Sequence, residues 1–381
     1  MKIAYCISAL NHQAGMERII IDKVNWLSRH GYDMTIIVGN SAPETMPFDI
    51  DPAVNLVYFG IEGTLSFEIP FLDPVLKEYR ARLSEHLNAV HYDIVVSTGV
   101  ADSHVLYKIK DGSRKVVEYH FALHHEEYFR KAYHQNLIYR LKGKLLTWCT
   151  IANGRRYDRV VVLTDGDYNE WRRYTRHVVK ISNTSLINPS QVSTCDSHEV
   201  IAVGRLSAQK GFDYLIDAWA IVAQRHPDWN LSIYGCDNGE DNARVQAMYD
   251  KIDALQLSRD IIKGSTDNIV QRYIDSSIMV SSSRYEGFSL VLLEAGLCGL
   301  PLIAYDCPHG PSEIVDNGVN GILIPKVGDI QALADAICHL IENEPLRKQM
   351  GQQALHLKSR FSPDIIMPQW EHLFNSLLSQ K

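Results

Sequence analysis

Two glutamates, Glu286 and Glu294, lie on either side of an apolar run in the stretch SSSRYEGFSLVLLEAGL. A carboxylate buried in such a run without a partner costs on the order of several kcal/mol. Two explanations follow from these residues alone. Either Glu294 binds a ligand, or it lies on a solvated helix stripe or bonds neighbouring backbone.

Two cations lie upstream in VGRLSAQKGFDYL, where a strand is expected to end at Gly204 and a helix to begin near Phe212. Arg205 and Lys210 fall on the loop between them. Cations at a helix N-terminus suit a diphosphate, because the helix dipole and the free N–H groups already favour an anion there. The alternative is a solvated loop with incidental charges.

Two other loops have residues that suit close approach to a ligand. In EGFSL, Gly287 allows the backbone to approach a bound group, and Ser289 is expected to cap the following helix. A further helix start that favours anions is expected at HGPSEIVDNG, from Gly310 onward.

Short β-branched strands and helices alternate along the chain, which predicts an α/β fold with doubly wound parallel sheets. The first forty residues read as strand, loop, helix and strand, with Gly31 as a helix C-cap. We expect one long helical region from about Glu126 to Tyr157. A second series begins at VIAVGRLSAQKG and ends in a hairpin-like GILIP.

The alternation is interrupted between Val179 and Glu199, a stretch rich in Ser, Thr, Asn and Pro that predicts a hinge. We therefore expect an N-terminal domain over residues 1–185 and a C-terminal domain over 190–355, with a helix at about 362–381 completing the first. Open α/β sheets bind ligands at the carboxyl ends of their strands, so a cleft between two facing domains is expected.

Composition narrows the class of protein. A net charge of −7 argues against nucleic-acid binding. Seven scattered cysteines without a C-x-x-C pair are expected to be reduced core thiols of a cytoplasmic protein. The start MKIAYCISAL favours a buried strand over a signal peptide. No apolar run reaches the roughly 18 residues of a membrane span, so any membrane contact should be peripheral.

The motifs together resemble one family. E-G-F-S-L-V-L-L-E, with G-R-L-S-x-x-K-G upstream and C-P-x-G-P-S-E-I-x-x-x-G-x-x-G downstream, is similar to the family 4 (group 1) retaining glycosyltransferases. The resemblance spans nearly the whole chain. It implies the GT-B fold of two Rossmann-like domains. It also implies transfer of a hexose or N-acetylhexosamine from a nucleotide-sugar, expected to be a UDP-sugar, to a glycan or lipid-linked acceptor. The implied pathway is biosynthesis of a surface polysaccharide, lipopolysaccharide or capsule.

The resemblance also implies roles for single residues. Arg205 and Lys210 would hold the donor diphosphate and offset its growing charge, Glu286 would accept hydrogen bonds from the transferred sugar, and Glu294 would bind the ribose hydroxyls. The implied catalytic residues are Glu286, His120, Arg205 and Lys210. The implied binding residues are Gly15, Glu17, Gly204, Arg205, Lys210, Gly264, Glu286, Gly287, Phe288, Ser289, Leu290 and Glu294. No cofactor and no metal are expected. The family often has two adjacent glycines where this chain has Ala14 and Gly15.

The sequence argues against two other classes of enzyme. An oxidoreductase would need G-x-G-x-x-G after a strand, which SALNHQAG lacks. A glycoside hydrolase using Glu286 and Glu294 would have no use for the cationic loop. A non-catalytic sugar-nucleotide-binding partner stays open, and so does a metal site on the side chains of His120, His124, His125 and Glu126.

Residues 128–159 combine many cations with Tyr133, Tyr139 and Trp148, against the single acid Asp158. The cations are Arg130, Lys131, Arg140, Lys142, Lys144, Arg155, Arg156 and Arg159. This segment suits an anionic membrane surface or a lipid-diphosphate acceptor, and the alternative is a solvated helix face.

Overall fold

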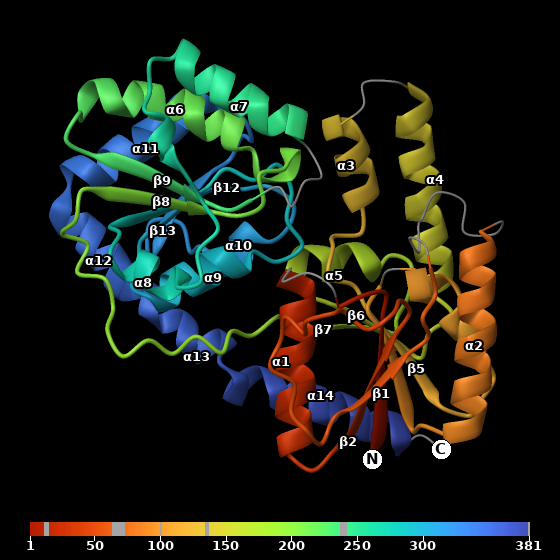
Figure 1. Ribbon diagram of the computed structural model, residues 1–381. Helices are drawn as coiled ribbons and strands as arrows, with labels where there is room; N and C mark the ends of the chain where they lie inside the picture. The colour runs from red at the N-terminus through yellow and green to blue at the C-terminus, as the bar shows by residue number, and fades with distance from the viewer. Residues whose placement is uncertain (11–14, 63–72, 100, 134–136, 237–241, 380–381) are drawn as a thin grey trace. The chain divides into compact units, whose positions relative to one another are not determined.

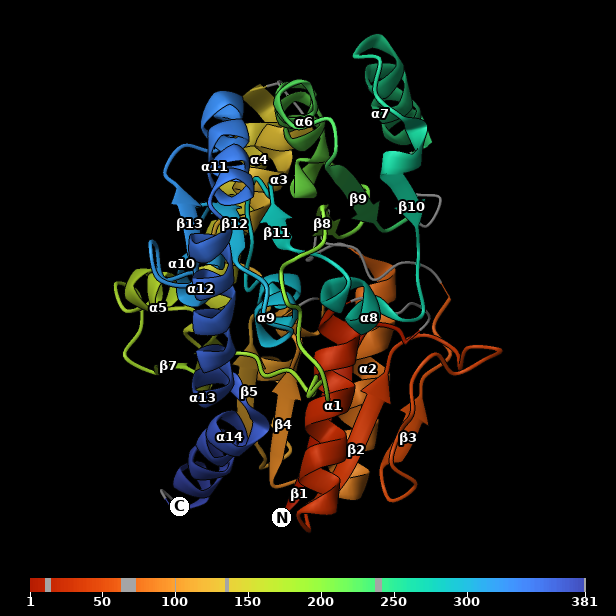
Figure 2. The same cartoon turned by 90° about the vertical axis from the view of Figure 1, so that its left-hand side faces the viewer.

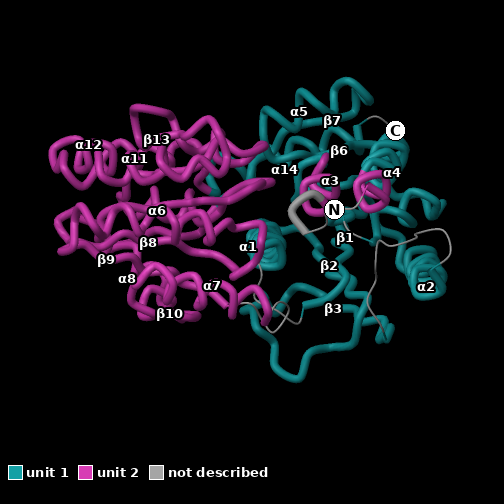
Figure 3. The backbone as a smooth tube through the Cα atoms, turned by 90° about the horizontal axis from the view of Figure 1, so that it is seen from above, with its two compact units in different colours: residues 1–123, 144–184, 363–381 teal, residues 124–143, 185–362 magenta. Residues whose placement is uncertain are grey.

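A computed structural model describes the chain except for residues 11–14, 63–72, 100, 134–136, 237–241 and 380–381. The chain divides into two units (Figure 3). Unit 1 comprises residues 1–123, 144–184 and 363–381, and unit 2 comprises residues 124–143 and 185–362. Each unit is built on one parallel sheet, which is the Rossmann-like arrangement that the alternating pattern predicts.

The sheet of unit 1 has seven parallel strands in the order β3-β2-β1-β4-β5-β6-β7. Its central strands are buried on both faces, as their Val- and Ile-rich sequences predict. The strands are β1 (Lys2–Ile7), β2 (Asp33–Val38), β3 (Asn55–Tyr58), β4 (Ile94–Ser97), β5 (Arg114–Glu118), β6 (Arg159–Val162) and β7 (Val178–Lys180).

Helices cover both faces of this sheet, with α1 on one side and α2 on the other (Figures 1 and 2). Asp73 accepts hydrogen bonds from the backbone N–H groups of Val75 and Leu76, and Pro74 occupies the first turn, so α2 begins as its sequence dictates. The helices of unit 1 are α1 (Gly15–Arg29), α2 (Pro74–Val90), α5 (Asp165–Trp171), α14 (Pro363–Leu378) and the 3₁₀ turns Ala101–His104 and Leu106–Lys108.

The sheet of unit 2 has six parallel strands in the order β10-β9-β8-β11-β12-β13. The strands are β8 (Glu199–Val203), β9 (Asn230–Tyr234), β10 (Ile262–Gly264), β11 (Ile278–Ser281), β12 (Leu302–Tyr305) and β13 (Gly321–Ile324). The expected hairpin at GILIP is wrong, because β13 pairs parallel to β12, from Leu302 opposite Gly321. The chain between them crosses back through α10 (Pro311–Ile314), so it re-enters the sheet in the same direction.

In unit 2, α6 (Phe212–Arg225), α7 (Asn242–Ala254) and α11 (Ile330–Glu342) lie on one side of the sheet, and α8 (Ile269–Ile274) and α9 (Leu290–Leu297) lie on the other (Figures 1 and 2). Unit 2 also contains α3 (His125–Tyr133), α12 (Glu344–Ala354) and α13 (Lys358–Phe361). The described part of unit 2 also has 3₁₀ turns at Ala208–Lys210, Arg259–Ile261 and Leu355–Leu357.

Two further expectations are wrong. The helical region expected over 126–157 consists of two helices, α3 and α4 (Leu137–Gly154), and the boundary between the units falls within α4. All seven cysteines are free thiols, but Cys236 is exposed rather than in the core, since it follows the end of β9.

Candidate functional site

The residues predicted to bind the donor gather where strands of unit 2 end. Gly204 follows β8, and the loop up to Gly211 leads into α6. Glu286 lies on the loop that joins β11 to α9. Because neighbouring parallel strands end at the same edge of a sheet, the two loops lie together there.

An ion pair links these loops. The ammonium nitrogen of Lys210 lies 2.7 Å from Oε1 of Glu286, and the hydroxyl of Ser283 donates to the same oxygen at 2.7 Å. Among the residues that the structure describes, both hydrogen bonds to the Glu286 side chain are made to Oε1. One carboxylate oxygen is therefore held by the protein, and the other can accept from a ligand.

Glycines allow the two loops to approach closely. Gly211 has a φ of +61°, and a Cβ at this position would lie 2.2 Å from the carbonyl oxygen of Ser282. Any side chain here would push the cationic loop away from β11. Gly204 lies against the side chain of Lys210, whose Cε would be 2.9 Å from an added Cβ.

Arg284 ties the same two loops together, and sequence reasoning missed it. Its guanidinium donates to both carboxylate oxygens of Asp213, at 2.9 and 2.7 Å, and to the carbonyl of Ala208 at 2.7 Å. It also lies 4.0 Å from the ring centroid of Tyr214. The signal in the sequence was a pair of opposite charges, each within a few residues of a motif residue.

Backbone and amide bonds reinforce this connection. The backbone N–H of Arg284 donates to the carbonyl of Gln209 at 2.7 Å, and the Gln209 side chain donates to the carbonyl of Tyr285 at 3.1 Å. The hydroxyl of Ser282 donates to the carbonyl of Lys210 at 2.9 Å. Each of these bonds positions the loop that carries Lys210 against the loop that carries Glu286.

Burial alone would raise the pKa of Asp213, but the hydrogen bonds and charge of Arg284 outweigh it and hold that pKa below its usual value. Cys307, next to Glu286, is almost completely buried. Burial first, and the charge of Glu286 second, raise the pKa of its thiol well above the usual value, so it stays protonated.

The expected capping bond of Ser289 is absent. Ser289 is the residue before α9, but its side chain makes no capping hydrogen bond. Its backbone has φ −86° and ψ 88°, and its buried Oγ has no partner among the described residues. A buried hydroxyl without a partner is unusual, so this group is available to a ligand at the start of α9.

Glu294 is 8% exposed in the middle of α9, so the solvated-stripe explanation of this carboxylate is wrong. The negative charge of Glu294 acts on Cys298, which lies one helical turn later. Burial first, and the charge of Glu294 second, raise the pKa of the Cys298 thiol to about 12.

The other predicted residues of unit 2 lie along the same edge. Arg205 is exposed on the loop after β8, and Gly264 ends β10 with a φ of +75°. Gly287 is half-buried, Leu290 is the first residue of α9, and Phe288 packs edge-on against Phe361 at 5.6 Å.

The predicted residues of unit 1 lie at the ends of other elements. His120 comes two residues after the end of β5 and is 8% exposed. Burial lowers the pKa of its imidazole to about 4, the charge of Glu118 acts in the opposite direction, and Lys23 adds to the lowering. Gly15 and Glu17 lie in the first turn of α1, while Ala14 lies outside the described residues.

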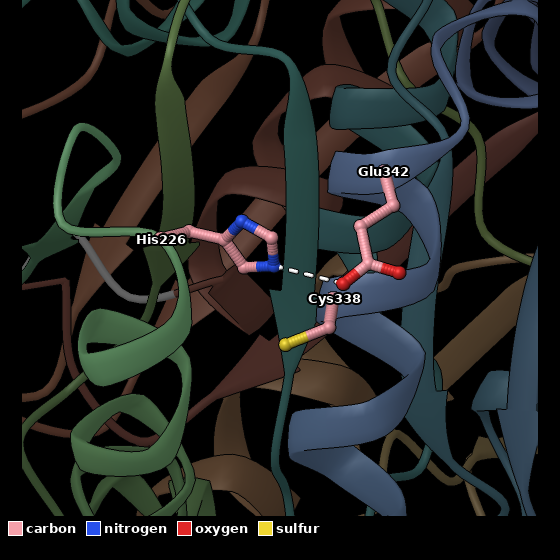
Figure 4. Close-up of side chains that lie close together, drawn as sticks. All are labelled: His226, Cys338 and Glu342. Carbon is pink, nitrogen blue, oxygen red and sulfur yellow. Dashed lines mark hydrogen bonds and ion pairs between the residues drawn. The ribbon is translucent and has the colours of Figure 1, made fainter.

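A cluster of metal-ligating types lies elsewhere in unit 2. Ligand atoms of His226, Cys338 and Glu342 lie within 4.8 Å of one another, and Nε2 of His226 is 3.0 Å from Oε1 of Glu342 (Figure 4). His226 follows the last residue of α6, whereas the cationic loop precedes the first. The helix spans roughly 20 Å, so this cluster is not part of the site described above.

The metal site that the sequence left open, on His120, His124, His125 and Glu126, is not formed among the described residues. Among the described residues, His124, His125 and Glu126 do not belong to any cluster of three ligand atoms. Nδ1 of His124 instead lies 2.9 Å from Glu127, and Nε2 of His125 lies 3.5 Å from Glu126.

Two Rossmann-like units, one with cations and a carboxylate gathered at its strand ends, are what a glycosyltransferase with the GT-B fold requires, and the family comparison assigns the chain to that class. The chain belongs to glycosyltransferase family 4, the group 1 glycosyl transferases. The profile of Glycosyltransferase Family 4 matches residues 14–183, and that of Glycosyl transferases group 1 matches residues 187–356.

Individual proteins agree with this assignment. An uncharacterized glycosyltransferase of Haemophilus influenzae is 26% identical over 380 residues, covering 97% of this chain and 99% of that protein. The amylovoran biosynthesis glycosyltransferase AmsD of Erwinia amylovora is 26% identical over 388 residues, covering 98% and 99%. Anabaena Alr3699/HepE, solved in complex with UDP and glucose, superimposes with a TM-score of 0.77 at 20% identity, covering 99% of this chain and 100% of that one.

Proposed function

We propose that this glycosyltransferase moves a hexose or N-acetylhexosamine from a UDP-sugar to a glycan or lipid-linked acceptor, with retention at the anomeric carbon, in surface polysaccharide, lipopolysaccharide or capsule biosynthesis. The observation that carries the proposal is the pairing of Lys210 with Glu286 between two strand-end loops. This pair offers a cation for a diphosphate and a carboxylate for sugar hydroxyls at one place.

The donor would bind in three parts. Arg205 and Lys210 would hold the diphosphate and stabilise the charge that develops on it, so no metal is needed. An ammonium group has three donors, so Lys210 can keep its bond to Glu286 while it donates to a phosphate. Oε2 of Glu286 would accept from the transferred sugar, and Glu294 would bind the ribose hydroxyls.

Two comparisons support the finer parts of the proposal. HepE was solved with UDP and glucose, which favours UDP as the nucleotide and a hexose as the sugar. AmsD is named for biosynthesis of amylovoran, which favours a polysaccharide acceptor. The free thiols of all seven cysteines are consistent with action in the cytoplasm.

A thermal-shift panel tests the donor. The full chain is heated with UDP-, GDP- and ADP-sugars, each with glucose, galactose or N-acetylglucosamine as the sugar, and with each free nucleotide. A specific donor present at about 100 times its Kd stabilises by about 2.7 kcal/mol. We expect the UDP series to raise Tm most. A larger shift with GDP- or ADP-sugars would contradict the assignment of UDP.

The alternative is a non-catalytic sugar-nucleotide-binding partner of another glycosyltransferase. Such a protein would show the same thermal shift, but it would neither transfer the sugar nor slowly hydrolyse the donor. Incubation with the best donor, with and without an extract of lipid-linked glycans, separates the two. Release of UDP that disappears in Glu286→Gln would exclude the alternative.

We also propose a peripheral contact between α4 and an anionic membrane. One face of α4 has large apolar side chains at helical spacing, each more than half exposed: Leu137, Ile138, Leu141, Leu145 and Trp148. Arg140, Lys142 and Lys144 flank this stripe, which is the arrangement of an interfacial helix at an anionic surface. Within the described residues, no helix has both the length and the apolar character of a membrane span.

Vesicle co-sedimentation tests this contact. We expect the full chain to sediment with phosphatidylglycerol vesicles and much less with phosphatidylcholine vesicles. The substitution Leu141→Glu should reduce binding at least about tenfold, because it places a charge in the apolar stripe. Val319→Glu, at an exposed apolar position of unit 2, is the matched control. Equal binding by both variants would contradict the proposal, and a concentration-dependent dimer abolished by Leu141→Glu would assign the stripe to a second copy.

A further inference from the structure

Unit 1 contains a buried ion pair close to His120. The ammonium group of Lys23, from α1, bonds Oε1 of Glu118, the last residue of β5. The Glu118 side chain is fully buried, and the Lys23 side chain is 4% exposed. The family resemblance gives no role to either residue.

The surroundings of Lys23 are aromatic. Its ammonium nitrogen lies 3.9 Å from the ring centroid of Trp370, in α14, and 5.7 Å from that of Tyr5, in β1. Two rings can attract the cation, but removal of both charges from water still costs several kcal/mol per ion, on the order of what the pair regains. Stability alone therefore explains this pair poorly.

His120 makes the third member of the group. Its Nε2 lies 3.5 Å from Oε1 of Glu118. Oε2 of Glu118 and Nε2 of His120 are both buried without a hydrogen-bond partner among the described residues. Buried polar atoms that lack a partner call for an explanation, and here two of them belong to the neighbourhood of one imidazole.

We propose that Glu118 and Lys23 are positioning residues for His120. Glu118 accepts the hydrogen of Nε2 when the ring settles against it, which selects the tautomer in which Nδ1 has a lone pair. Nδ1 is then an acceptor for a hydroxyl of the transferred sugar. Lys23 balances the charge of Glu118, so the carboxylate orients the ring without drawing a second proton onto it. The role of the sugar rests on the proposed function, whereas the selection of the tautomer does not.

The charges around the ring have opposite effects. Among the described residues, the charged groups that act on His120 are Glu118 on β5 and Lys23 on α1. Tyr5 on β1 faces Glu118, and burial raises the pKa of its phenol well above the usual value, so it stays neutral. Without Lys23, an unbalanced buried carboxylate would favour the imidazolium form.

Nuclear magnetic resonance of the full chain labelled with ¹³C and ¹⁵N histidine tests the proposal without any turnover. His120→Gln identifies the resonances of His120 among those of the 16 histidines. We expect wild type to show the Nε2–H tautomer at pH 7. In Lys23→Met, the pKa of His120 should rise by at least about one pH unit, because its nearest charged neighbour is now an unbalanced carboxylate. In the double variant Lys23→Met/Glu118→Gln, this rise should disappear.

Matched variants control for damage to the fold. Lys23→Arg keeps the cation and should keep the pKa and tautomer of His120. Lys115→Met breaks another buried ion pair, between Lys115 and Asp111 at the amino end of β5, and should leave the His120 signals unchanged. If Lys23→Met does not fold, Glu118→Gln gives the test through the ¹⁵N shifts, since an amide accepts or donates and no longer selects one tautomer.

The outcomes separate this inference from the proposed function. An unchanged pKa in folded Lys23→Met, or an unchanged tautomer in Glu118→Gln, would overturn the positioning role. If donor turnover is found, the acid limb of its kcat/KM profile should move to higher pH in Lys23→Met and return in the double variant. Absence of turnover with every donor would refute the proposed function and leave the resonance result standing.

Discussion

Replacement of Arg284 by methionine should disable the proposed donor site, although no contact between Arg284 and the donor is proposed. Methionine keeps most of the length of the side chain and removes the guanidinium, so Asp213 loses both of its bonds to Arg284 and the carbonyl of Ala208 loses its donor. The loop that carries Lys210 is then held to β11 by fewer bonds. We expect both lower stability of unit 2 and lower kcat/KM.

The size of the effect follows from burial. Loss of one partner from a fully buried pair costs about 3–5 kcal/mol, and from an exposed pair about 0–1 kcal/mol. The side chains of Arg284 and Asp213 are 19% and 35% exposed, so water can partly replace the lost bonds, and a loss of about 2 kcal/mol is expected. For activity, a displacement of Lys210 by about 1 Å costs on the order of 100-fold.

Three measurements test this: the urea midpoint of the full chain, the Kd for UDP by calorimetry, and kcat/KM with the best donor. Arg284→Lys keeps the charge but not the planar fork, so it should fall between wild type and Arg284→Met. Arg225→Met is the matched control, because its bond to Asp335 joins side chains that are about half exposed at the other end of α6. Wild-type kcat/KM in Arg284→Met would refute the reasoning, and so would equal losses in both variants.

Three other predictions concern Glu294, the requirement for a metal, and His104. Glu294→Ala should weaken UDP binding at least about tenfold with a smaller change in kcat, since its proposed contact is to the ribose; unchanged affinity in calorimetry would contradict it. Saturating EDTA should leave the rate within about twofold, because Arg205 and Lys210 supply the positive charge; loss of activity that Mg²⁺ or Mn²⁺ restores would be the opposite result. Burial first, and Lys108 second, lower the pKa of His104 to about 4, so folded His104 stays neutral below its usual pKa of 6.5. Its contribution to stability is complete above pH 6.5 and is lost as the pH falls toward 4, so the urea midpoint of His104→Asn should fall less on acidification than that of wild type.

Local patterns of the sequence predicted the elements that position the donor loops. Strand ends at Val203 and Ser281, and helix starts at Phe212 and Leu290, follow from short β-branched runs, glycines and apolar spacing. Because parallel strands end at one edge, the proximity of the loops after β8 and β11 was predictable as well.

Partners distant in sequence could not be predicted in this way. Arg284 and Asp213 are 71 positions apart, and nothing in either local sequence specifies the other. Lys23 and Glu118 are separated by 95 positions, and a lysine in the middle of an amphipathic helix is ordinarily solvated. The pair of Lys23 and Glu118 can be recognised only in the folded chain, where α1 and β5 lie close together.

The errors have a common physical origin. The run GILIP has the composition of a strand but contains no information on direction, which the crossover through α10 decides. Serine is a favoured residue at a helix N-cap. At Ser289, however, φ is −86° and ψ is 88°, and the side-chain hydroxyl makes no capping hydrogen bond. Propensity describes what a residue favours in isolation, and the tertiary structure overrides it at both positions.

Two groups bear on how the site could select a sugar-nucleotide over a free nucleotide. The hydroxyl of Ser289 has no partner among the described residues, and the protein bonds the Glu286 carboxylate through Oε1. A diphosphate beside Glu286 experiences repulsion from the carboxylate, which Lys210 offsets through its 2.7 Å ion pair with Oε1. A free nucleotide would bring phosphate oxygens close to Oε2 and provide no donor for it. A sugar hydroxyl would provide that donor. The same carboxylate would thus weaken binding of the free nucleotide and favour a donor that still has its sugar, so the fixed bonds to Lys210 and Ser283 would give selectivity as well as position.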